Sequence, residues 1–343
     1  MAKLTRMRRR GVTVILGAVI TALLAIGVMA MPLPYVVLKP GPTVNTLGSD
    51  NGKEVIQVTK ASTSTSAGQL RLTTVSVQPK VELVWAIQGW LSNEQAVVPR
   101  DLIYPPNQTQ QQVEQQNEQE FKTSQTSAET VALRELGYPV QTVVTKVTAS
   151  GPSVGKLAEK DVLTTVNGVA VTGAGKLTAL IRSKKAGTTL TVGYTRAGTP
   201  GTVQITTNKE KRIGVEINQN QPHPFTLSID LDEIGGPSAG LMFTLGIIDK
   251  LRPADLTGGK IIAGTGTIDD DGDVGPIGGI PQKLVGAKRA GAQLFLVPAG
   301  NCAEAMRNPV AGLAMAEVAT VDDALAALRT FAGGGTPKAC PAS

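Results

Sequence analysis

Histidine is nearly absent from this 343-residue chain, in which His223 is the only one. Histidine is the usual general base beside a serine nucleophile and a common metal ligand. Cysteine is scarce as well, and the only two, Cys302 and Cys340, belong to no cluster with metal-ligand spacing. We therefore expect no metal and no other cofactor. A serine nucleophile in this chain needs a base other than histidine, unless His223, otherwise expected in a loop, takes that role.

Aromatic residues make up 3% of the chain, against 41% for all hydrophobic residues, so aliphatic side chains must fill the cores. The length predicts two or three domains.

A phosphate-binding loop is also missing. Two glycine runs imitate one, but residues 151–157 have one residue too few and end in leucine, and residues 173–177 lack the required spacing. An ATP site is therefore not expected.

The formal charge of +6 at pH 7 does not indicate nucleic-acid binding. Residues 1–10 carry five of the positive charges and no acidic residue, which leaves +1 for the rest of the chain. Residues 11–31 are uncharged and mainly apolar, and as a helix they would reach roughly 30 Å, the thickness of a hydrocarbon core. Charge on the N-terminal side predicts a single-pass anchor with residues 1–10 in the cytoplasm and the main body outside. A cleaved signal peptide is the alternative, although residues 28–32 make a poor cleavage site.

Cysteine usage agrees with this topology. Cys302 and Cys340 both lie in the part expected outside the cytoplasm, where disulfides persist. We expect a bridge that ties the tail to the C-terminal domain. Two unpaired thiols are the alternative.

Ser238 has the setting of a nucleophile. It follows Gly236-Pro237 and precedes Ala239-Gly240, and small neighbours let a backbone or a substrate approach closely. The apolar run at 241–248 predicts a buried helix, whose N–H groups and dipole would stabilise an oxyanion beside the hydroxyl. Since Pro237 has no N–H, the donors must come from Ser238, from Ala239 or from a neighbouring strand.

Lys283 is the candidate base. A lysine can accept a proton near neutral pH when burial or a positive dipole disfavours its ammonium form. Pro281 predicts that Lys283 lies in the first turn of a helix, where a cation opposes the helix dipole. Such a place suits a lysine that is meant to be neutral. Taken singly, a capped turn at Ser238 and a solvated Lys283 are the alternatives.

Taken together and in order, these segments resemble the proteolytic domain of the Lon family of Ser–Lys peptidases. The resemblance covers much of the C-terminal third of the chain. Its segments are the Gly-Pro-Ser-Ala-Gly string, residues 265–268, residues 272–279 leading to Lys283, a strand at 294–298, Asn301, and a last helix from 320 to 325.

This resemblance implies that Ser238 is the nucleophile and Lys283 the base, and that Thr265 supports the lysine. Gly236 and Ala239 would support the serine turn. Many Lon enzymes carry an acidic residue three positions before the serine, where this chain has Gly235. The family also implies protein or peptide substrates and a homo-oligomer.

The stretch before residue 137 predicts strands at 35–38, 55–58 and 70–77, with a turn at 39–42. Residues 108–120 hold seven glutamines and predict a solvated helix or a flexible connector. A helix follows at 124–133, with Ser124 as its cap. The strand near 70 and this helix resemble early elements of Lon proteolytic domains.

Residues 137–209 resemble a PDZ domain of the bacterial protease type. Alternating strands at 143–147, 161–171, 189–196 and 203–206 and a helix at 174–184 carry the resemblance. Such domains add a peptide as a strand and capture its carboxylate with backbone N–H groups. The resemblance places that loop near Gly137, Tyr138 and Val140. A rigid spacer is the alternative role.

These observations predict an α+β chain in six parts: a basic tail (1–10), an anchor (11–31), the first part of a Lon-like domain with the glutamine-rich segment (32–136), an inserted PDZ domain (137–209), the rest of the Lon-like domain (210–333) and a tail (334–343). This order resembles the YlbL-type family of membrane-tethered bacterial proteins with Lon-like and PDZ domains. The resemblance implies an ATP-independent serine endopeptidase in the cell membrane that cleaves unfolded or tail-recognised proteins outside the cytoplasm. A catalytically silent, membrane-tethered binding or chaperone module is the alternative.

Overall fold

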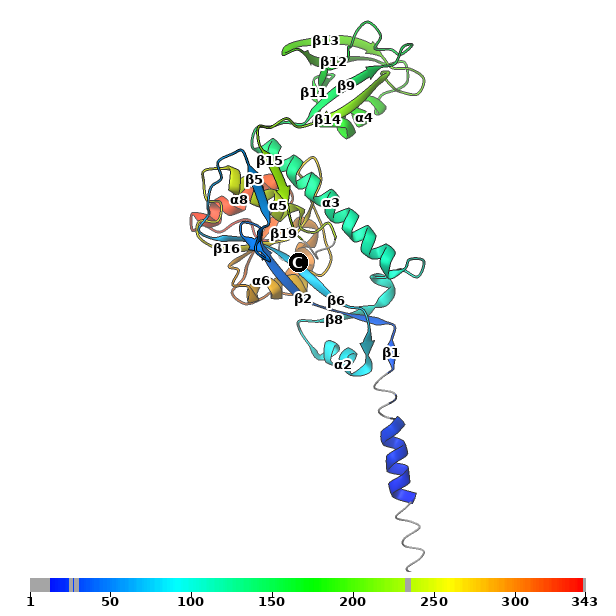
Figure 1. The fold of residues 1–343 in the computed structure, drawn as a ribbon, viewed down its shortest axis with the longest axis vertical. Coiled ribbons are helices and arrows are strands. Elements are labelled where there is room, and N and C mark those ends of the chain that lie inside the picture. The colour runs from blue at the N-terminus through cyan, green and yellow to red at the C-terminus, as the bar shows by residue number, and fades with distance from the viewer. Residues whose placement is uncertain (1–12, 25–26, 28–30, 232–235, 342–343) are drawn as a thin grey trace, which may run out of the picture.

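The computed structural model describes residues 13–24, 27, 31–231 and 236–341 (Figure 1). Two stretches of the chain, before and after residues 141–220, build one α+β body, and the residues between them form a smaller domain. The smaller domain has its own hydrophobic core, whose buried members all lie between Val144 and Ile213. The largest core of the body joins residues from Val55 to Leu133 with residues from Phe225 to Leu328. The body is therefore interrupted, rather than followed, by the second domain.

The predicted membrane anchor, residues 11–31, lies partly outside the described residues, and the basic tail at 1–10 lies wholly outside them. Residues 13–24 form an exposed helix. Among the helices that the structure describes, none is long and apolar enough to cross a membrane.

A six-stranded mixed sheet forms the centre of the body. Its order is β20 (Ala314–Val318), β19 (Leu294–Pro298), β16 (Ile261–Gly264), β6 (Gln69–Gln78), β2 (Tyr35–Asn45) and β8 (Ala96–Pro99). The first four strands are parallel, and β2 runs antiparallel to both of its neighbours. All five residues of β19 are buried, as expected for an inner parallel strand covered on both faces.

The turn predicted at residues 39–42 is wrong. Strand β2 runs through this segment, and its register against β6 shifts between Pro40 and Thr43. Proline and glycine are tolerated in strands at such irregularities because a ladder hydrogen bond is already missing there.

Helices cover both faces of the sheet. They are α2 (Leu83–Leu91), α3 (Gln110–Glu135), α5 (Gly240–Leu251), α6 (Ile280–Arg289), α7 (Cys302–Arg307) and α8 (Val321–Ala332). Helix α5 is buried over nearly its whole length and packs against α3, whereas α6 packs against β2 and β6. Short pairs complete the body: β1 (Pro32–Leu33) with β7 (Val81–Glu82), β3 (Ser49–Asp50) with β4 (Lys53–Glu54), β5 (Ile56–Thr59) with β15 (Thr226–Ile229), and β17 (Thr267–Ile268) with β18 (Val274–Gly275); η1 (Arg100–Leu102) and η2 (Ala299–Asn301) are 3₁₀ turns.

Helix α3 is one continuous helix over two segments that were predicted separately, residues 108–120 and 124–133. The glutamine-rich stretch is its solvated first half and is not a flexible connector. Thr109 caps the helix through a reciprocal capping box with Gln112. The cap predicted at Ser124 is therefore wrong, because Ser124 lies in the middle of the helix and is buried.

The smaller domain is a curled antiparallel sheet with one helix. Its strand order is β13 (Thr199–Thr206), β12 (Thr189–Arg196), β10 (Val162–Val166), β9 (Gln141–Val147) and β14 (Val215–Asn220), with β11 (Val169–Ala170) beside β10 and α4 (Ala174–Arg182) against the sheet. Strand β14 lies beyond residue 209, where the sequence suggested that the domain ends. Because β14 pairs with β9 along its length, the sheet extends this domain to residue 220.

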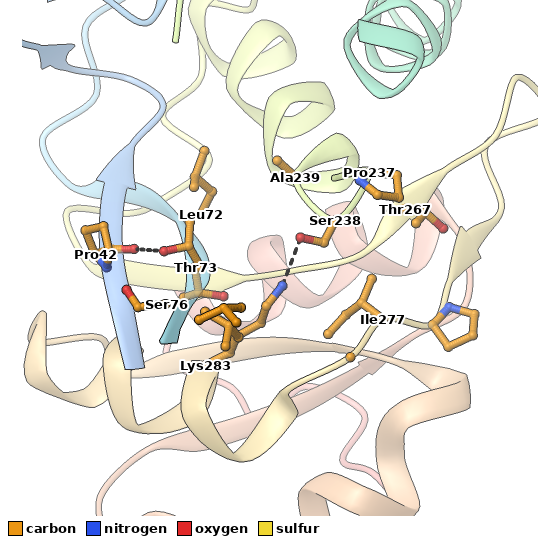
Figure 2. Close-up of a pocket in the computed structure, with 15 residues that line it drawn as sticks. Pro42, Leu72, Thr73, Ser76, Pro237, Ser238, Ala239, Thr267, Ile277 and Lys283 are labelled. Atoms are coloured by element: carbon orange, nitrogen blue, oxygen red, sulfur yellow. Dashed lines mark hydrogen bonds between the residues drawn. The ribbon is translucent and has the colours of Figure 1, made fainter. Parts of the chain in front are cut away.

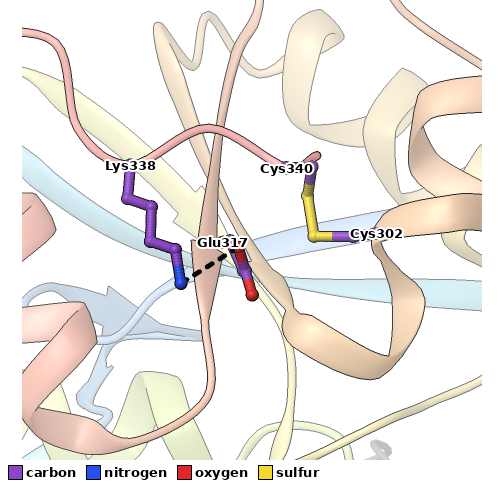
Figure 3. Close-up of a disulfide and its surroundings, with 4 residues drawn as sticks. All are labelled: Cys302, Glu317, Lys338 and Cys340. Carbon is purple, nitrogen blue, oxygen red and sulfur yellow. Dashed lines mark ion pairs between the residues drawn. A yellow bond between two sulfur atoms is a disulfide. The ribbon is translucent and has the colours of Figure 1, made fainter. Parts of the chain in front are cut away.

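Cys302 and Cys340 form a disulfide at the end of the chain (Figure 3). The bridge joins the start of α7 to the C-terminal tail. The tail also lies along β20, where the N–H of Glu317 donates to the carbonyl of Lys338 and the two side chains form an ion pair at 3.2 Å. The tail is thus part of the body.

Candidate active site

Ser238 lies in the turn that leads into α5, with Ala239 as the N-cap residue of that helix. Gly236, two residues earlier, has a φ of +86°, a conformation that favours glycine. Gly240 permits close packing: a Cβ there would lie 2.7 Å from Ser124 Oγ and 2.8 Å from Ile268 Cγ2. The small residues around Ser238 therefore allow the turn to fit between α3 and β17 while the serine stays half-exposed.

Lys283 reaches Ser238 from the first turn of α6. Its Nζ lies 2.9 Å from Ser238 Oγ (Figure 2) and 2.8 Å from Thr265 Oγ1. The lysine is only 3% exposed, and this burial lowers its pKa from 10.5 to about 7. No carboxylate of the described residues forms an ion pair with it. Gly235, three positions before the serine, lies outside the described residues. A large share of Lys283 is therefore neutral near pH 7.

Thr265 fixes the orientation of the amine. It is fully buried, and its hydroxyl donates to the backbone carbonyl of Ser238 at 3.0 Å. Because its proton is used there, Thr265 Oγ1 can only accept a hydrogen bond from Lys283. A neutral amine that donates to Thr265 can turn its lone pair toward Ser238 Oγ, which is the geometry that proton abstraction needs.

Backbone donors lie next to the serine. The N–H groups of Ser238 and Ala239 have no acceptor among the described residues, whereas the N–H of Gly236 donates to the carbonyl of Asn117. Gly236 thus shapes and braces the turn and offers no free donor. Ser238 and Ala239 remain the candidate donors for an oxyanion at the start of α5.

Helix α3 holds the serine turn in place, which the sequence did not suggest. Ser124 Oγ donates to the carbonyl of Pro237 at 3.0 Å, and the carbonyl of Asn117 accepts from Gly236. Helix α3 thus contacts the turn on the N-terminal side of Ser238. Ser124 lies in the buried second half of α3, and in the sequence this serine resembles a helix cap, so the sequence did not indicate the contact.

A cleft of about 560 Å³ opens beside Ser238 and Lys283 (Figure 2). One wall is the stretch of β6 from Leu72 to Val77, and the opposite wall includes Thr267 and residues 276–278. Strand β16 pairs with β6 only as far as Leu72, and beyond that point this edge of β6 has no strand partner among the described residues. The cleft therefore presents free backbone groups in line with the serine.

The residues predicted to bind a peptide terminus lie elsewhere. Gly137, Tyr138 and Val140 precede β9, and β9 is paired on both sides. The ring of Tyr138 packs against Phe225 and His223 in the body. The groove of the smaller domain, about 410 Å³, lies instead between α4 and the edge strand β14. The loop that enters β14, residues 211–214, closes one end of it. The sequence missed this groove because it left β14 out of the domain.

His223 is a loop residue. Its Nδ1 lies 2.7 Å from the carbonyl of Gln221, and its ring packs against that of Phe225 at an interplanar angle of 44°. It does not line the cleft that holds Ser238. The alternative pairing of the serine with this histidine therefore has no geometric support.

Comparison with known proteins assigns both domains. Residues 111–207 match the family described as PDZ domain, and residues 232–329 match the family described as Lon protease (S16) C-terminal proteolytic domain. The expected α+β fold, a Lon-type proteolytic domain combined with a PDZ domain, is confirmed.

Curated relatives match only part of the chain. Over 93 residues, 26% of this chain, it is 40% identical to the Lon protease of Azospirillum brasilense, of which it covers 11%. Over 186 residues, 53% of this chain, it is 27% identical to Lon protease 2 of Bacillus subtilis, of which it covers 32%. Among solved structures, the PDZ domain of the SdrC-like protein from Listeria monocytogenes is 25% identical and covers 22% of this chain and 85% of its own, with a TM-score of 0.21.

Proposed function

We propose that this chain is a serine endopeptidase in which Ser238 is the nucleophile and Lys283 the general base. The observation that carries the proposal is a buried amine, with a pKa lowered to about 7, that lies 2.9 Å from a serine hydroxyl at the wall of an open cleft. A structural lysine gains nothing from such burial, since desolvation disfavours its charged form. Perturbed titratable groups in clefts are typical of catalytic sites.

The reaction follows from these positions. Ser238 Oγ attacks the scissile carbonyl carbon while neutral Lys283 takes the hydroxyl proton. The oxyanion of the tetrahedral intermediate accepts from the N–H groups of Ser238 and Ala239. The carbon–nitrogen bond then breaks, and the Lys283 ammonium gives its proton to the leaving amine. Water, deprotonated by Lys283 in the same way, hydrolyses the acyl-enzyme and restores the Ser238 hydroxyl.

The cleft favours an extended substrate. The free edge of β6 from Thr73 to Val77 can pair with a peptide as an added strand, which would lay the scissile bond beside Ser238. Only an unfolded or flexible segment can adopt this form. The sequence contains no phosphate-binding loop, so we propose that cleavage proceeds without ATP.

The test is cleavage of an unfolded protein such as casein by the full chain, with and without ATP. A general base typically accelerates a reaction roughly 100- to 10,000-fold. Lys283→Ala and Ser238→Ala should therefore each lower the cleavage rate at least about 100-fold. Ser228→Ala, on the exposed face of β15, is the matched control and should retain activity. A serine-directed fluorophosphonate should label the parent chain and not Ser238→Ala.

Two outcomes would refute the proposal. Cleavage that survives in both variants places the chemistry elsewhere. A parent chain that neither cleaves flexible substrates nor reacts with the probe is the silent binding or chaperone module.

We also propose that the chain is anchored by its N-terminal segment with both domains outside the cytoplasm. The charge distribution of residues 1–31 supports this, and so does the disulfide between Cys302 and Cys340, since such bridges persist in oxidising compartments. Whole cells can be treated with a thiol-blocking reagent before lysis and then with a mass-shifting maleimide after reduction. Two labelled thiols that appear only after reduction support the proposal, whereas thiols blocked without reduction contradict it.

The PDZ domain would present substrates to the protease. Its groove has the free edge of β14 on one side and Ile181 of α4 on the other, which suits a peptide added as a strand. Ile217→Arg fills this groove and should abolish peptide binding, whereas Asn218→Arg, at an exposed position of β14 that does not line the groove, should not. Binding of a C-terminal peptide library to the full chain checks this. If no peptide binds the parent chain, the domain is a spacer.

A further inference from the structure

Helix α2 buries its small residues and exposes its large apolar ones, the opposite of a helix on the surface of a soluble domain. Its small residues Ala86 and Gly89 are buried against the sheet, and a Cβ on Gly89 would lie 2.6 Å from Val97 Cγ2. Its large apolar residues point outward: Val84, Trp85, Ile87, Trp90 and Leu91, called here the α2 face. Leu91 is 82% exposed and Trp90 57%. A helix that packs by its large side chains would show the opposite arrangement.

The two tryptophans are held in these exposed positions. Trp90 packs edge-on against Tyr35 with ring centroids 6.0 Å apart, and Lys39 Nζ lies 5.9 Å from the ring of Trp85. Helix α2 itself contains no charged residue. Leu102, at the end of η1, is 71% exposed and adds to the apolar surface. Contiguous exposed apolar surfaces of this kind mark interaction sites.

The position of α2 in the chain points to its partner. Strand β7 leads directly into α2 and pairs with β1, the first strand after the N-terminal segment (Figure 1). The exposed apolar helix at residues 13–24 is joined to β1 by seven residues, which reach at most roughly 25 Å. Helix α2 therefore cannot be far from the surface that the N-terminal segment enters.

We infer that the α2 face docks on the lipid surface of the membrane, at the boundary between headgroups and acyl chains. This inference rests on the anchoring proposed above. Tryptophan prefers this boundary because its ring is apolar and its N–H is polar. Lys39, Lys80 and Arg100 lie in the segments around α2, but Glu82, Glu94 and Asp101 lie in the same segments, so the docking rests on the apolar side chains and not on net charge. Docking would give the body a second contact with the membrane and so fix its orientation.

Tryptophan fluorescence tests this directly, because Trp85 and Trp90 are the only tryptophans in the chain. The full chain is reconstituted into vesicles of zwitterionic and anionic phospholipid, with bromine either near the headgroups or at the acyl-chain ends. We expect quenching mainly by the shallow bromines. We also expect acrylamide to quench the emission of the parent chain at least about twofold less than that of the triple variant Val84→Ser, Ile87→Ser, Leu91→Ser, with both chains in detergent-free lipid nanodiscs. The N-terminal segment contributes no signal, since residues 1–31 contain no tryptophan.

The triple variant Val84→Ser, Ile87→Ser, Leu91→Ser keeps both tryptophans and changes only exposed side chains. It should still float with the vesicles but lose the shallow quenching. The matched control is Val154→Ser, Val169→Ser in the PDZ domain, two residues of similar exposure, and it should behave as the parent chain.

Other outcomes overturn the inference in distinguishable ways. A parent chain that floats but shows no bromine quenching is anchored without docking through α2. Tryptophans protected in a way that depends on protein concentration and not on bromine would mean that a second copy covers the α2 face. A parent chain that does not float refutes the anchoring and the docking together, while casein cleavage tests the protease independently.

Discussion

At the scale of single residues, the proposed mechanism predicts that the environment of Lys283 determines the pH dependence of cleavage. Only the neutral amine can take the proton of Ser238, and burial lowers the pKa of Lys283 to about 7. We therefore expect kcat to rise with pH through about 7 and to level off above about 8. Single-turnover cleavage of a fluorogenic peptide between pH 5.5 and 9 measures this. A rate that is flat across that range would show that Lys283 is not the base.

The same burial affects stability. In the unfolded chain the lysine has a pKa near 10.5, so between pH 7 and pH 10.5 the unfolded state binds more protons and stability rises with pH. Below pH 7 the folded protein bears the full cost of a buried ammonium, about 4–5 kcal/mol at 1.36 kcal/mol per pKa unit.

Lys283→Met removes this titration while keeping a long apolar side chain. The free energy of unfolding of the parent chain, measured relative to this variant, should increase by about 2–3 kcal/mol from pH 7 to pH 9. Denaturant unfolding followed by circular dichroism at several pH values checks it. Ser238→Ala, which keeps the lysine, is the control and should follow the parent chain. A difference that does not change with pH would mean that the amine is solvated.

At the scale of elements, α3 contacts the Ser238 turn, and the proposed mechanism predicts that this support affects catalysis. Ser124 Oγ donates to the carbonyl of Pro237, and the carbonyl of Asn117 accepts from the N–H of Gly236, so α3 makes two hydrogen bonds to the turn before Ser238. Ser124→Ala removes one neutral hydrogen bond, worth about 0.5–1.5 kcal/mol, and should lower kcat roughly threefold to tenfold while KM changes little. Thr123→Ala is the control, because its exposed hydroxyl bonds only within the helix. Equal losses in both variants would indicate a general effect on α3.

The elements that the sequence predicted well are those in which local pattern and burial agree. Residues 294–298 form a wholly apolar strand between turn signals, and Pro281 begins a helix that carries Lys283 inward. The Ser238 turn was predictable because glycine, proline and alanine leave few other structures there. These elements were predictable because the packing of the folded chain and the local conformational preference of the residues favour the same structure.

The elements that the sequence mispredicted depend on partners far along the chain. Strand β2 continues through Pro40 because β6 pairs on both sides of the irregularity. Strand β14 is polar and recognisable only by its pairing with β9. Ser124 looks like a cap, and only the fold shows that it meets Pro237. Hydrophobic periodicity is read over a short segment of sequence, so it cannot reveal these contacts, each of which joins residues distant in sequence.

At the scale of the whole molecule, the PDZ domain is an insertion whose two ends meet. Gln221 Nε2 donates to the carbonyls of Tyr138 and Thr130, and the rings of Tyr138, His223 and Phe225 pack together. The inserted domain has a separate core. Among the described residues, one exposed hydrogen bond, from Thr172 to Asp271, joins the domains outside this junction. The body should therefore fold without the insertion.

Replacing residues 141–220 with a short glycine–serine linker tests this independence. Because the ends already lie side by side, the linker orders few residues and costs little closure entropy. We expect a folded protein that cleaves a short flexible peptide within about twofold of the parent rate, since the cleft, Ser238 and Lys283 belong wholly to the body. Cleavage of proteins that bind through the PDZ groove should fall to the level of the Ile217→Arg variant. If short-peptide cleavage is lost while circular dichroism stays native, the PDZ domain takes part in assembling the active site and does more than present substrates.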